Sequence, residues 1–140
     1  MKIGAVIIVD TNVILDVLSD DPNWAEWSAA QFKACAARDR VAINDVIFAE
    51  LSVGYDRIED VDAALEKLEL HIASIPRAAL FLAGNAFKRY RENKGMKSGV
   101  LPDFFIGAHA AVERAILLTR DPRRYRSYFP TLKLIAPDPN

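Results

Sequence analysis

Residues 5–12 read AVIIVDTN, and this stretch decides how the rest of the chain is arranged. Its consecutive apolar residues, Val6 to Val9, are typical of a strand that is buried on both faces of a parallel sheet. Asp10 follows this strand at the carboxyl edge, where open α/β folds bind their ligands. A single carboxylate there is either an N-terminal cap of the next helix or part of a site. Its role therefore depends on how many other acids the chain brings to the same edge.

Size and composition predict one domain over residues 1–140. The chain is 51% hydrophobic and 26% charged, which is an ordinary globular balance, and it is long enough for a sheet with helices on both faces. The net charge of −1 neither favours nor excludes a nucleic-acid partner. Cys35 is the single cysteine, so an intrachain disulfide is excluded and a cytoplasmic location is expected. No apolar run approaches the roughly 18 residues of a membrane span, so no membrane partner is expected.

Strand and helix patterns alternate along the chain. Strands are expected at residues 6–9, 41–43, 70–75, 115–119 and 132–135, and helices at 11–18, 22–38, 45–54, 58–68, 76–93 and 103–114, with a helical turn after 121. This alternation predicts a single α/β domain with a mostly parallel sheet.

Two helices carry aromatic residues at helical spacing. In the helix at 22–38, one face is predicted to bury Trp24, Ser28, Phe32 and Cys35. Base stacking by Trp24 and Trp27 is the alternative interpretation, and packing in the core is the favoured one. In the helix at 76–93, the predicted apolar stripe is Leu80, Ala83, Phe87 and Tyr90.

Acidic residues from three further segments are predicted to reach the edge that holds Asp10. Helices run antiparallel to the strands they connect, so their N-termini lie at the carboxyl edge of the sheet. Asp103 opens a helix, and Asp121 directly follows a strand. Glu50 lies about 9 Å into its helix, but its long side chain leans back toward the N-terminus. We therefore expect all these carboxylates to converge.

Each acid also has a structural interpretation. Asp103 could stabilise the helix dipole, and Asp121 could cap the turn at Pro122. Glu50 is harder to explain in this way, because it lies in the apolar stretch IFAELSVG with no Lys or Arg between residues 40 and 57. A carboxylate in apolar surroundings needs a partner or a cation. The sequence therefore favours a metal site.

Carboxylate ligands select Mg²⁺ or Mn²⁺ over zinc. His71 and His109 are not expected to be ligands, because neither lies beside the acids in the predicted elements. Polar side chains next to the acids are expected to orient carboxylates or hold a water: Thr11, Asn12 and Thr119.

The chain resembles the PIN-domain family of metal-dependent ribonucleases, and within it the VapC-type toxins. The similar motifs are VDTNVILDVL, the AEL around residue 50, PDFFIGAHA, LLTRDPRRY, YFP and LIAP, which together span nearly the whole chain. The resemblance implies a three-layer α/β/α sandwich, a Mg²⁺ or Mn²⁺ cofactor, RNA cleavage, a homodimer and a VapB-type antitoxin partner. The family's acidic catalytic and metal-binding residues match Asp10, Glu50, Asp103 and Asp121.

Basic residues on two segments are candidates for contacts with the RNA backbone. One group comprises Lys88, Arg89, Arg91, Lys94 and Lys97, and the other comprises Arg120, Arg123, Arg124 and Arg126. Solvated surface charge is the alternative for most of them, and a structural contact is the alternative for Arg120. Among these, Lys88, Arg89, Lys97, Arg120, Arg123 and Arg124 are the predicted RNA-binding set.

Other classes of protein fit less well. A receiver domain would carry adjacent acids after the first strand and a Lys after a late strand, where this chain has Asp10 alone and Arg120. A phosphatase with an Asp nucleophile would carry a second acid where this chain has Asn12. Two alternatives within the family stay open: an RNA-processing nuclease outside a toxin–antitoxin pair, and an inactive PIN domain that only binds RNA or protein.

Overall fold

A parallel sheet forms the centre of the molecule. The computed structural model describes residues 6–93 and 101–137. Within these residues the sheet has five strands in the order β3-β2-β1-β4-β5, and every neighbouring pair is parallel. The strands are β1 (Val6–Val9), β2 (Arg40–Asn44), β3 (His71–Ala73), β4 (Ile116–Leu118) and β5 (Lys133–Ile135). The α/β prediction is confirmed, and the sheet is wholly rather than mostly parallel in the described residues.

Strand β1, which contains the apolar run Val6–Val9, is the central strand. Ile7, Ile8 and Val9 are at most 1% exposed, because strands lie on both sides of β1 and helices cover both faces. Burying an aliphatic side chain of this size contributes about 1.5–3 kcal/mol. Asp10, immediately after β1, is thereby held at the middle of the carboxyl edge.

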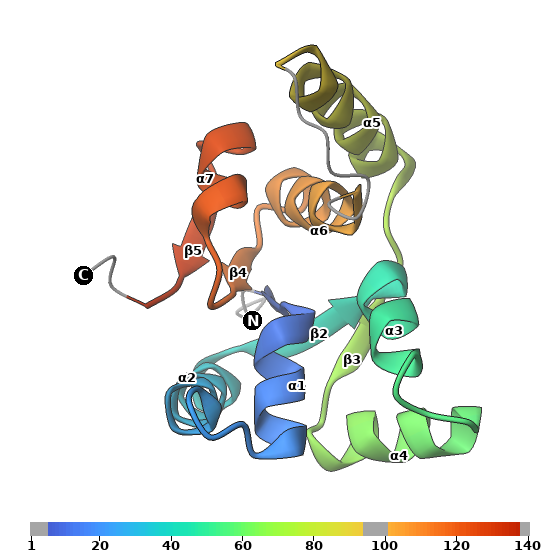
Figure 1. The fold of residues 1–140 in the computed structure, drawn as a ribbon, viewed down its shortest axis with the longest axis vertical. Helices are drawn as coiled ribbons and strands as arrows, with labels where there is room; N and C mark the ends of the chain where they lie inside the picture. The colour runs from blue at the N-terminus through green and yellow to red at the C-terminus, as the bar shows by residue number, and fades with distance from the viewer. Residues whose placement is uncertain (1–5, 94–100, 138–140) are drawn as a thin grey trace, which may run out of the picture.

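Helices cover both faces of the sheet, as Figure 1 shows. On one side lie α1, α2, α3 and α4, which connect β1 to β2 and β2 to β3. On the other side lie α5, α6 and α7. Their bounds are α1 (Thr11–Ser19), α2 (Ala25–Arg38), α3 (Asp45–Ser52), α4 (Ile58–Lys67), α5 (Arg77–Glu92), α6 (Leu101–Val112) and α7 (Arg123–Tyr128). This arrangement confirms the three-layer sandwich.

Two local expectations about helix faces are wrong in part. On α5, Ala83 is buried and Phe87 and Tyr90 pack against the core as predicted, but the fully buried residues are the alanines Ala79, Ala83 and Ala86, and Leu80 is 43% exposed. Small side chains let α5 approach α6 closely, so the larger residue is turned outward. On α2, Ser28 and Cys35 are buried as predicted, but Trp24 precedes the helix and is not part of the buried core.

An aromatic cluster joins α5, α6 and α7. Phe104 of α6 lies 5.2–6.3 Å, between ring centroids, from Phe87, Tyr90, Tyr128 and Phe129. Most of these pairs meet edge to face, the geometry that aromatic quadrupoles prefer. The cluster fixes α7 against α6, and α7 carries residues that reach the carboxyl edge.

Gly107 of α6 packs closely against aromatic rings at the end of α7. A Cβ at this position would lie 2.6 Å from two ring carbons of Phe129 and 3.0 Å from Tyr125. Both aromatic rings are almost fully buried and have no room to move. Any side chain at position 107 would therefore displace α7.

We predict that Gly107→Ala destabilises the protein by about 1–3 kcal/mol through this overlap, although alanine favours a helix. Gly84→Ala is the matched control, because Gly84 lies in α5 and a Cβ added there would have nothing within 4 Å. This control should stabilise the protein by about 0.5–1 kcal/mol. Urea unfolding of both variants measures the difference. Equal stability of the two variants would contradict the close packing of α6 on Phe129.

Candidate active site

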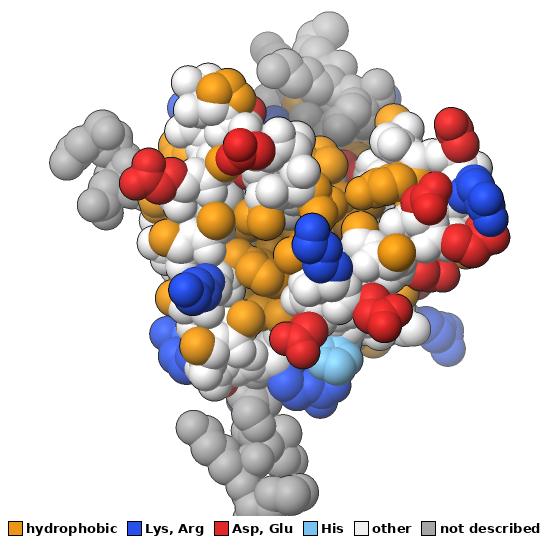
Figure 2. All heavy atoms as spheres, turned by 90° about the horizontal axis from the view of Figure 1, so that it is seen from below, with side chains coloured by type: hydrophobic (Ala, Val, Ile, Leu, Met, Phe, Trp, Pro, Cys, Tyr) orange, Lys and Arg blue, Asp and Glu red, His pale blue; other side chains and the backbone are white. Residues whose placement is uncertain are grey.

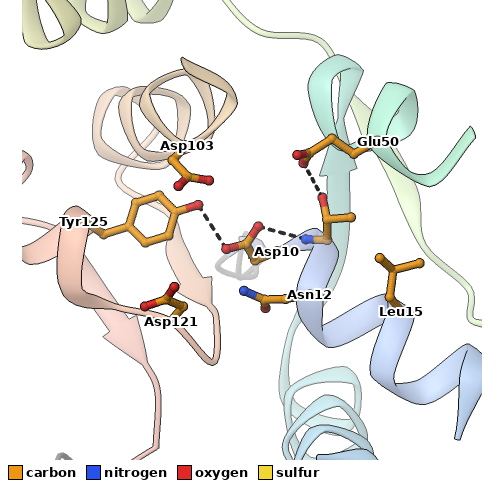
Figure 3. Close-up of a pocket in the computed structure, with 8 residues that line it drawn as sticks. Asp10, Asn12, Leu15, Glu50, Asp103, Asp121 and Tyr125 are labelled. Atoms are coloured by element: carbon orange, nitrogen blue, oxygen red, sulfur yellow. Dashed lines mark hydrogen bonds between the residues drawn. The ribbon is translucent and has the colours of Figure 1, made fainter. Parts of the chain in front are cut away.

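The predicted acids line one pocket at the carboxyl edge of the sheet. The pocket has a volume of about 230 Å³, and we call it the acidic pocket. Figure 3 shows its side chains entering from separate elements. They are Asp10, Thr11, Asn12, Leu15, Glu50, Asp103, Asp121 and Tyr125. The sequence-predicted convergence of Asp10, Glu50, Asp103 and Asp121 is therefore what the structure contains.

Asp10 is the most buried of these acids and is held by three hydrogen bonds. Its Oδ1 accepts from the backbone N–H of Thr11 at 2.8 Å, so it also caps α1. Its Oδ2 accepts from Thr119 Oγ1 at 2.8 Å and from the Tyr125 hydroxyl at 2.9 Å. Asp10 is thus both a helix cap and a residue of the pocket, because its two oxygens serve different partners.

Burial raises the pKa of Asp10 to about 6. The hydrogen bonds from Thr119 and Tyr125 oppose this rise, and the charge of Asp103 adds to it. The low polarity around the carboxyl dominates because it penalises the ionised form. A carboxyl group in a pocket whose pKa lies close to neutral pH is characteristic of a functional site.

Glu50 receives a neutral partner rather than a cation. Its Oε1 accepts a hydrogen bond of 2.6 Å from the Thr11 hydroxyl, and its side chain is partly exposed at the pocket. Burial and the charge of Asp103 raise the pKa of Glu50, while the Thr11 bond lowers it. No Lys or Arg lies near Glu50 in the sequence. In the folded protein, the Thr11 hydroxyl donates to one of the two Glu50 carboxylate oxygens instead.

Asp103 is paired with an arginine from α7. Arg124 Nη1 lies 2.6 Å from Asp103 Oδ2, and both side chains are about one-third exposed or less. Burial raises the pKa of Asp103, and the charge of Asp121 adds to the rise, whereas the Arg124 guanidinium lowers it. The guanidinium therefore offsets part of the negative charge of the acidic pocket.

Of the polar residues predicted to support the acids, Thr11 and Thr119 hydrogen-bond to an acid side chain, whereas Asn12 contacts Thr119 and the backbone of Arg120. Thr119 Oγ1 accepts from the backbone N–H of Asp121 at 3.1 Å and from Asn12 Nδ2 at 3.4 Å. Asn12 Oδ1 in turn accepts from the backbone N–H of Arg120 at 3.3 Å. These contacts fix the loop between β4 and α7 against the start of α1, and the bond from Thr11 to Glu50 ties the start of α1 to α3.

Sequence reasoning missed two residues of this arrangement. Tyr125 is 2% exposed and lies four residues after Asp121, and nothing in its local pattern marks it as a polar partner of Asp10. Asp16 is 2% exposed and accepts from Ser28 Oγ at 2.7 Å and from Arg120 Nε and Nη2 at 2.8 and 3.1 Å. Asp16 stands among apolar residues of α1, and this is the same signal that singled out Glu50.

The predicted RNA-binding residues fall into different environments. Arg120 forms the ion pair with Asp16, which is the structural contact that the sequence left open. Arg124 pairs with Asp103, which lines the acidic pocket. Lys88, Arg89 and Arg123 are exposed, and Lys97 lies outside the described residues, as does Lys94. His109, which was not expected to be a ligand, is buried with its Nδ1 3.1 Å from Asn44 Nδ2.

The acids fit a divalent metal in chemistry but are not gathered into a finished site. Their oxygens are the donors that Mg²⁺ and Mn²⁺ prefer. Within residues 6–93 and 101–137, however, no group of three or more His, Cys, Asp or Glu side chains is close enough together to hold a metal ion. One of the acids, Asp103, is instead held by Arg124.

Several solved structures share this fold. A chain of VapBC2 from Rickettsia felis, crystallised with a promoter DNA fragment, superposes with a TM-score of 0.73 at 20% identity, covering 95% of this chain and 99% of that one. A chain of VapBC-1 from nontypeable Haemophilus influenzae gives a TM-score of 0.70 at 18% identity, covering 94% and 97%. A toxin–antitoxin complex from Klebsiella pneumoniae gives 0.63 at 22%, covering 92% and 95%. At these identities the likeness establishes the fold.

No curated protein sequence matches the chain. The family model of the PIN domain matches residues 7–129, which include every acid of the acidic pocket and the sheet up to β4. This match spans far more than half of the chain. The protein belongs to the PIN-domain family.

Proposed function

We propose that this PIN domain is a Mg²⁺- or Mn²⁺-dependent endoribonuclease that acts as the toxin of a VapBC-type toxin–antitoxin pair. The observation that carries the proposal is the acidic pocket, where carboxylates from the β1–α1 junction, α3, α6 and the β4–α7 loop face one another. A fold needs no such gathering of acids for its stability, because like charges repel; of these acids Asp10 is buried, Glu50 and Asp103 are half-buried, and Asp121 is exposed. Their common use is to hold a divalent cation at a phosphate.

Asp10 and Asp103 would hold the metal directly, and Glu50 and Asp121 would bind it directly or through water. When bound, Mg²⁺ or Mn²⁺ would offset the negative charge of the phosphodiester and make water a better nucleophile. Thr119 and Tyr125 would keep the Asp10 carboxylate oriented, and Thr11 would do the same for Glu50. Arg124 would give up Asp103 to the cation, which releases its guanidinium for a phosphate oxygen.

Basic side chains around the pocket would hold the RNA strand by its phosphates. Arg123, Lys88 and Arg89 are exposed and available for this role. Contacts of this kind position a strand without reading its bases, and they weaken with salt. Lys97 remains part of the predicted set.

Partner proteins would cover the apolar surface. Figure 2 shows a hollow lined by hydrophobic side chains on the face where α2 and α4 lie, with charged side chains around it. An amphipathic antitoxin segment would bury such a surface. On α5, Phe81 is 75% exposed and Leu80 is 43% exposed, which supports a second copy of the chain as partner of that helix.

None of the helices in the described ranges is long and apolar enough to cross a membrane.

The first test is cleavage of RNA by the purified protein in Mg²⁺ and in chelator. We expect cutting only with the metal, and we expect Asp103→Asn to reduce it at least about 100-fold. Asp62→Asn, an exposed acid on α4, is the control and should cut normally. Cutting in chelator at the same rate would refute the metal-dependent mechanism, and absence of cutting with either metal would leave the inactive PIN domain as the explanation.

The toxin role has its own test. Expression in bacteria should arrest growth with loss of RNA, and co-expression of the product of the adjacent reading frame should relieve the arrest. RNA cleavage without growth arrest would favour the alternative, an RNA-processing nuclease outside a toxin–antitoxin pair.

Arg124 should compete with the metal for Asp103. We predict that Arg124→Gln lowers the melting temperature of the metal-free protein, because it leaves the Asp103 charge without its partner. The same variant should show a larger rise in melting temperature on addition of Mg²⁺, since no ion pair has to be broken. Arg40→Gln, at the opposite edge of the sheet, is the control. If Mg²⁺ shifts the wild type and Arg124→Gln equally, the ion pair does not oppose metal binding.

The raised pKa of Asp10 predicts a pH dependence of stability in chelator. A carboxyl whose pKa is about 6 in the folded state and near 3.8 in the unfolded state stabilises the fold when protonated. This contribution is complete below pH 3.8 and is lost as the pH rises through 6. Comparison of wild type with Asp10→Asn cancels the opposite effect of His109, whose pKa burial lowers. Wild type should lose stability relative to the variant between about pH 4 and 7, and parallel curves from urea unfolding would contradict the shift.

A further inference from the structure

A second hollow adjoins the acidic pocket. Its volume is about 430 Å³, and it shares Asp121 with the acidic pocket, so the two open beside one another. We call it the Trp24 pocket. The lining residues that matter here are Trp24, Arg120, Asp121, Pro122, Arg123 and Arg126. It thus combines an aromatic ring with several guanidinium groups.

The indole of Trp24 is held in place from two directions. The guanidinium carbon of Arg120 lies 5.5 Å from the ring centroid of Trp24, and the ring of Trp27 meets it edge-on at 6.0 Å. Arg120 is itself fixed by its paired hydrogen bonds to the buried Asp16. Trp24 is therefore an oriented ring at the surface of a pocket and not a residue of the buried core.

The cations of the Trp24 pocket are of two kinds. Arg120 is committed to Asp16, so its charge is already balanced. Arg123 and Arg126 lie on α7, are exposed, and form no ion pair with any residue in the described part of the chain. Two unbalanced guanidinium groups in the same pocket as a fixed indole suit a ligand that has both a flat ring and a negative charge.

We propose that the Trp24 pocket binds a nucleotide of single-stranded RNA adjacent to the phosphate that is cleaved, with its base stacked on Trp24 and its phosphates contacted by Arg123 and Arg126. The inference rests on the proposed nuclease function, because Asp121 makes the pocket continuous with the acidic pocket. Unpaired bases stack on aromatic side chains, and this stacking is tolerant of sequence. An acidic peptide would pair with the guanidinium groups of Arg123 and Arg126, but it would make no use of the oriented indole of Trp24.

This assignment has a consequence for the substrate. A base can reach Trp24 only when it is not stacked in a duplex, so cleavage should require a single strand or a loop at this position. Because any base has a π-face, the pocket should discriminate single-stranded from double-stranded RNA more strongly than one base from another.

Tryptophan fluorescence tests the proposal, since the chain has two tryptophans. In Trp27→Phe, Trp24 is the only indole, and a single-stranded RNA of about ten nucleotides added in chelator should quench it. In Trp24→Phe, the remaining Trp27 packs against the core and should change little. A duplex of the same sequence should quench less, and polyglutamate should not quench.

Affinity for the same RNA, measured by fluorescence anisotropy, gives the second readout. Trp24→Ala should bind about tenfold more weakly, and the double variant Arg123→Ala/Arg126→Ala should bind more weakly with a smaller dependence on salt. Arg40→Ala, at the opposite edge of the sheet, should bind as the wild type does. Trp24→Phe keeps a ring at the position and should retain most of the affinity even if Trp24→Ala folds poorly.

The outcomes separate this inference from the proposed function. If the wild type cleaves RNA in Mg²⁺ but RNA leaves Trp24 unquenched and Trp24→Ala binds as tightly as the wild type, the Trp24 pocket is not on the RNA path. Quenching by polyglutamate or equally by duplex would also overturn the proposal, in favour of an acidic protein partner or of a purely electrostatic surface. If no RNA is cleaved, the nuclease function fails, and quenching by single-stranded RNA alone would still support the pocket as an RNA site.

Discussion

The buried carboxylate of Asp10 is the constraint on which the carboxyl edge of this protein depends. A charge at the end of a fully buried strand is costly unless several donors reach it. The donors come from the first turn of α1, from the residue after β4 and from α7. Satisfying one carboxylate therefore brings three segments together, and these segments carry Asn12, Asp121 and Arg124 to the same place.

Supporting contacts extend from Asp10 in both directions. On the α6 side, the aromatic cluster around Phe104 and the close approach at Gly107 set the position of α7, and hence the reach of the Tyr125 hydroxyl. On the α2 side, the ion pair between Asp16 and Arg120 ties the β4–α7 loop to α1 and orients Trp24. The acidic pocket and the Trp24 pocket are therefore positioned by a common set of contacts around the β4–α7 loop.

Electrostatics in the acidic pocket are balanced only in part. Burial raises the pKa of Asp10, Glu50 and Asp103 alike, and the repulsion from neighbouring acids contributes to each rise. Hydroxyl groups and the Arg124 guanidinium reduce this unfavourable energy without removing it. This residual negative charge supports the proposed divalent cation, because carboxylate oxygens are the ligands that Mg²⁺ and Mn²⁺ prefer.

Much of this protein could be predicted from the sequence. The apolar run ending in Asp10 indicated a central parallel strand, because a strand with both faces covered has no polar alternation. The periods of about 2 and 3.6 residues located the helices and strands, and the geometry of parallel βα units placed Glu50, Asp103 and Asp121 at the edge of Asp10. Side-chain partners such as Thr119 were predicted because they adjoin the acids in the sequence.

Only the tertiary structure decided which side chains meet across the fold. The contacting pairs are far apart in the sequence: Tyr125 and Asp10 are separated by 115 positions, Arg120 and Asp16 by 104, and Arg124 and Asp103 by 21. No local pattern encodes such pairs. The same limit explains the errors on α5 and at Trp24: periodicity identifies an apolar face, but the partner's shape decides whether alanines or larger residues are buried in it. The periodicity of apolar residues thus determined the helices, the strands and the edge of the sheet that holds the site. Packing between distant segments decided which side chains meet, because the energy of each contact depends on neighbours that the local sequence does not contain.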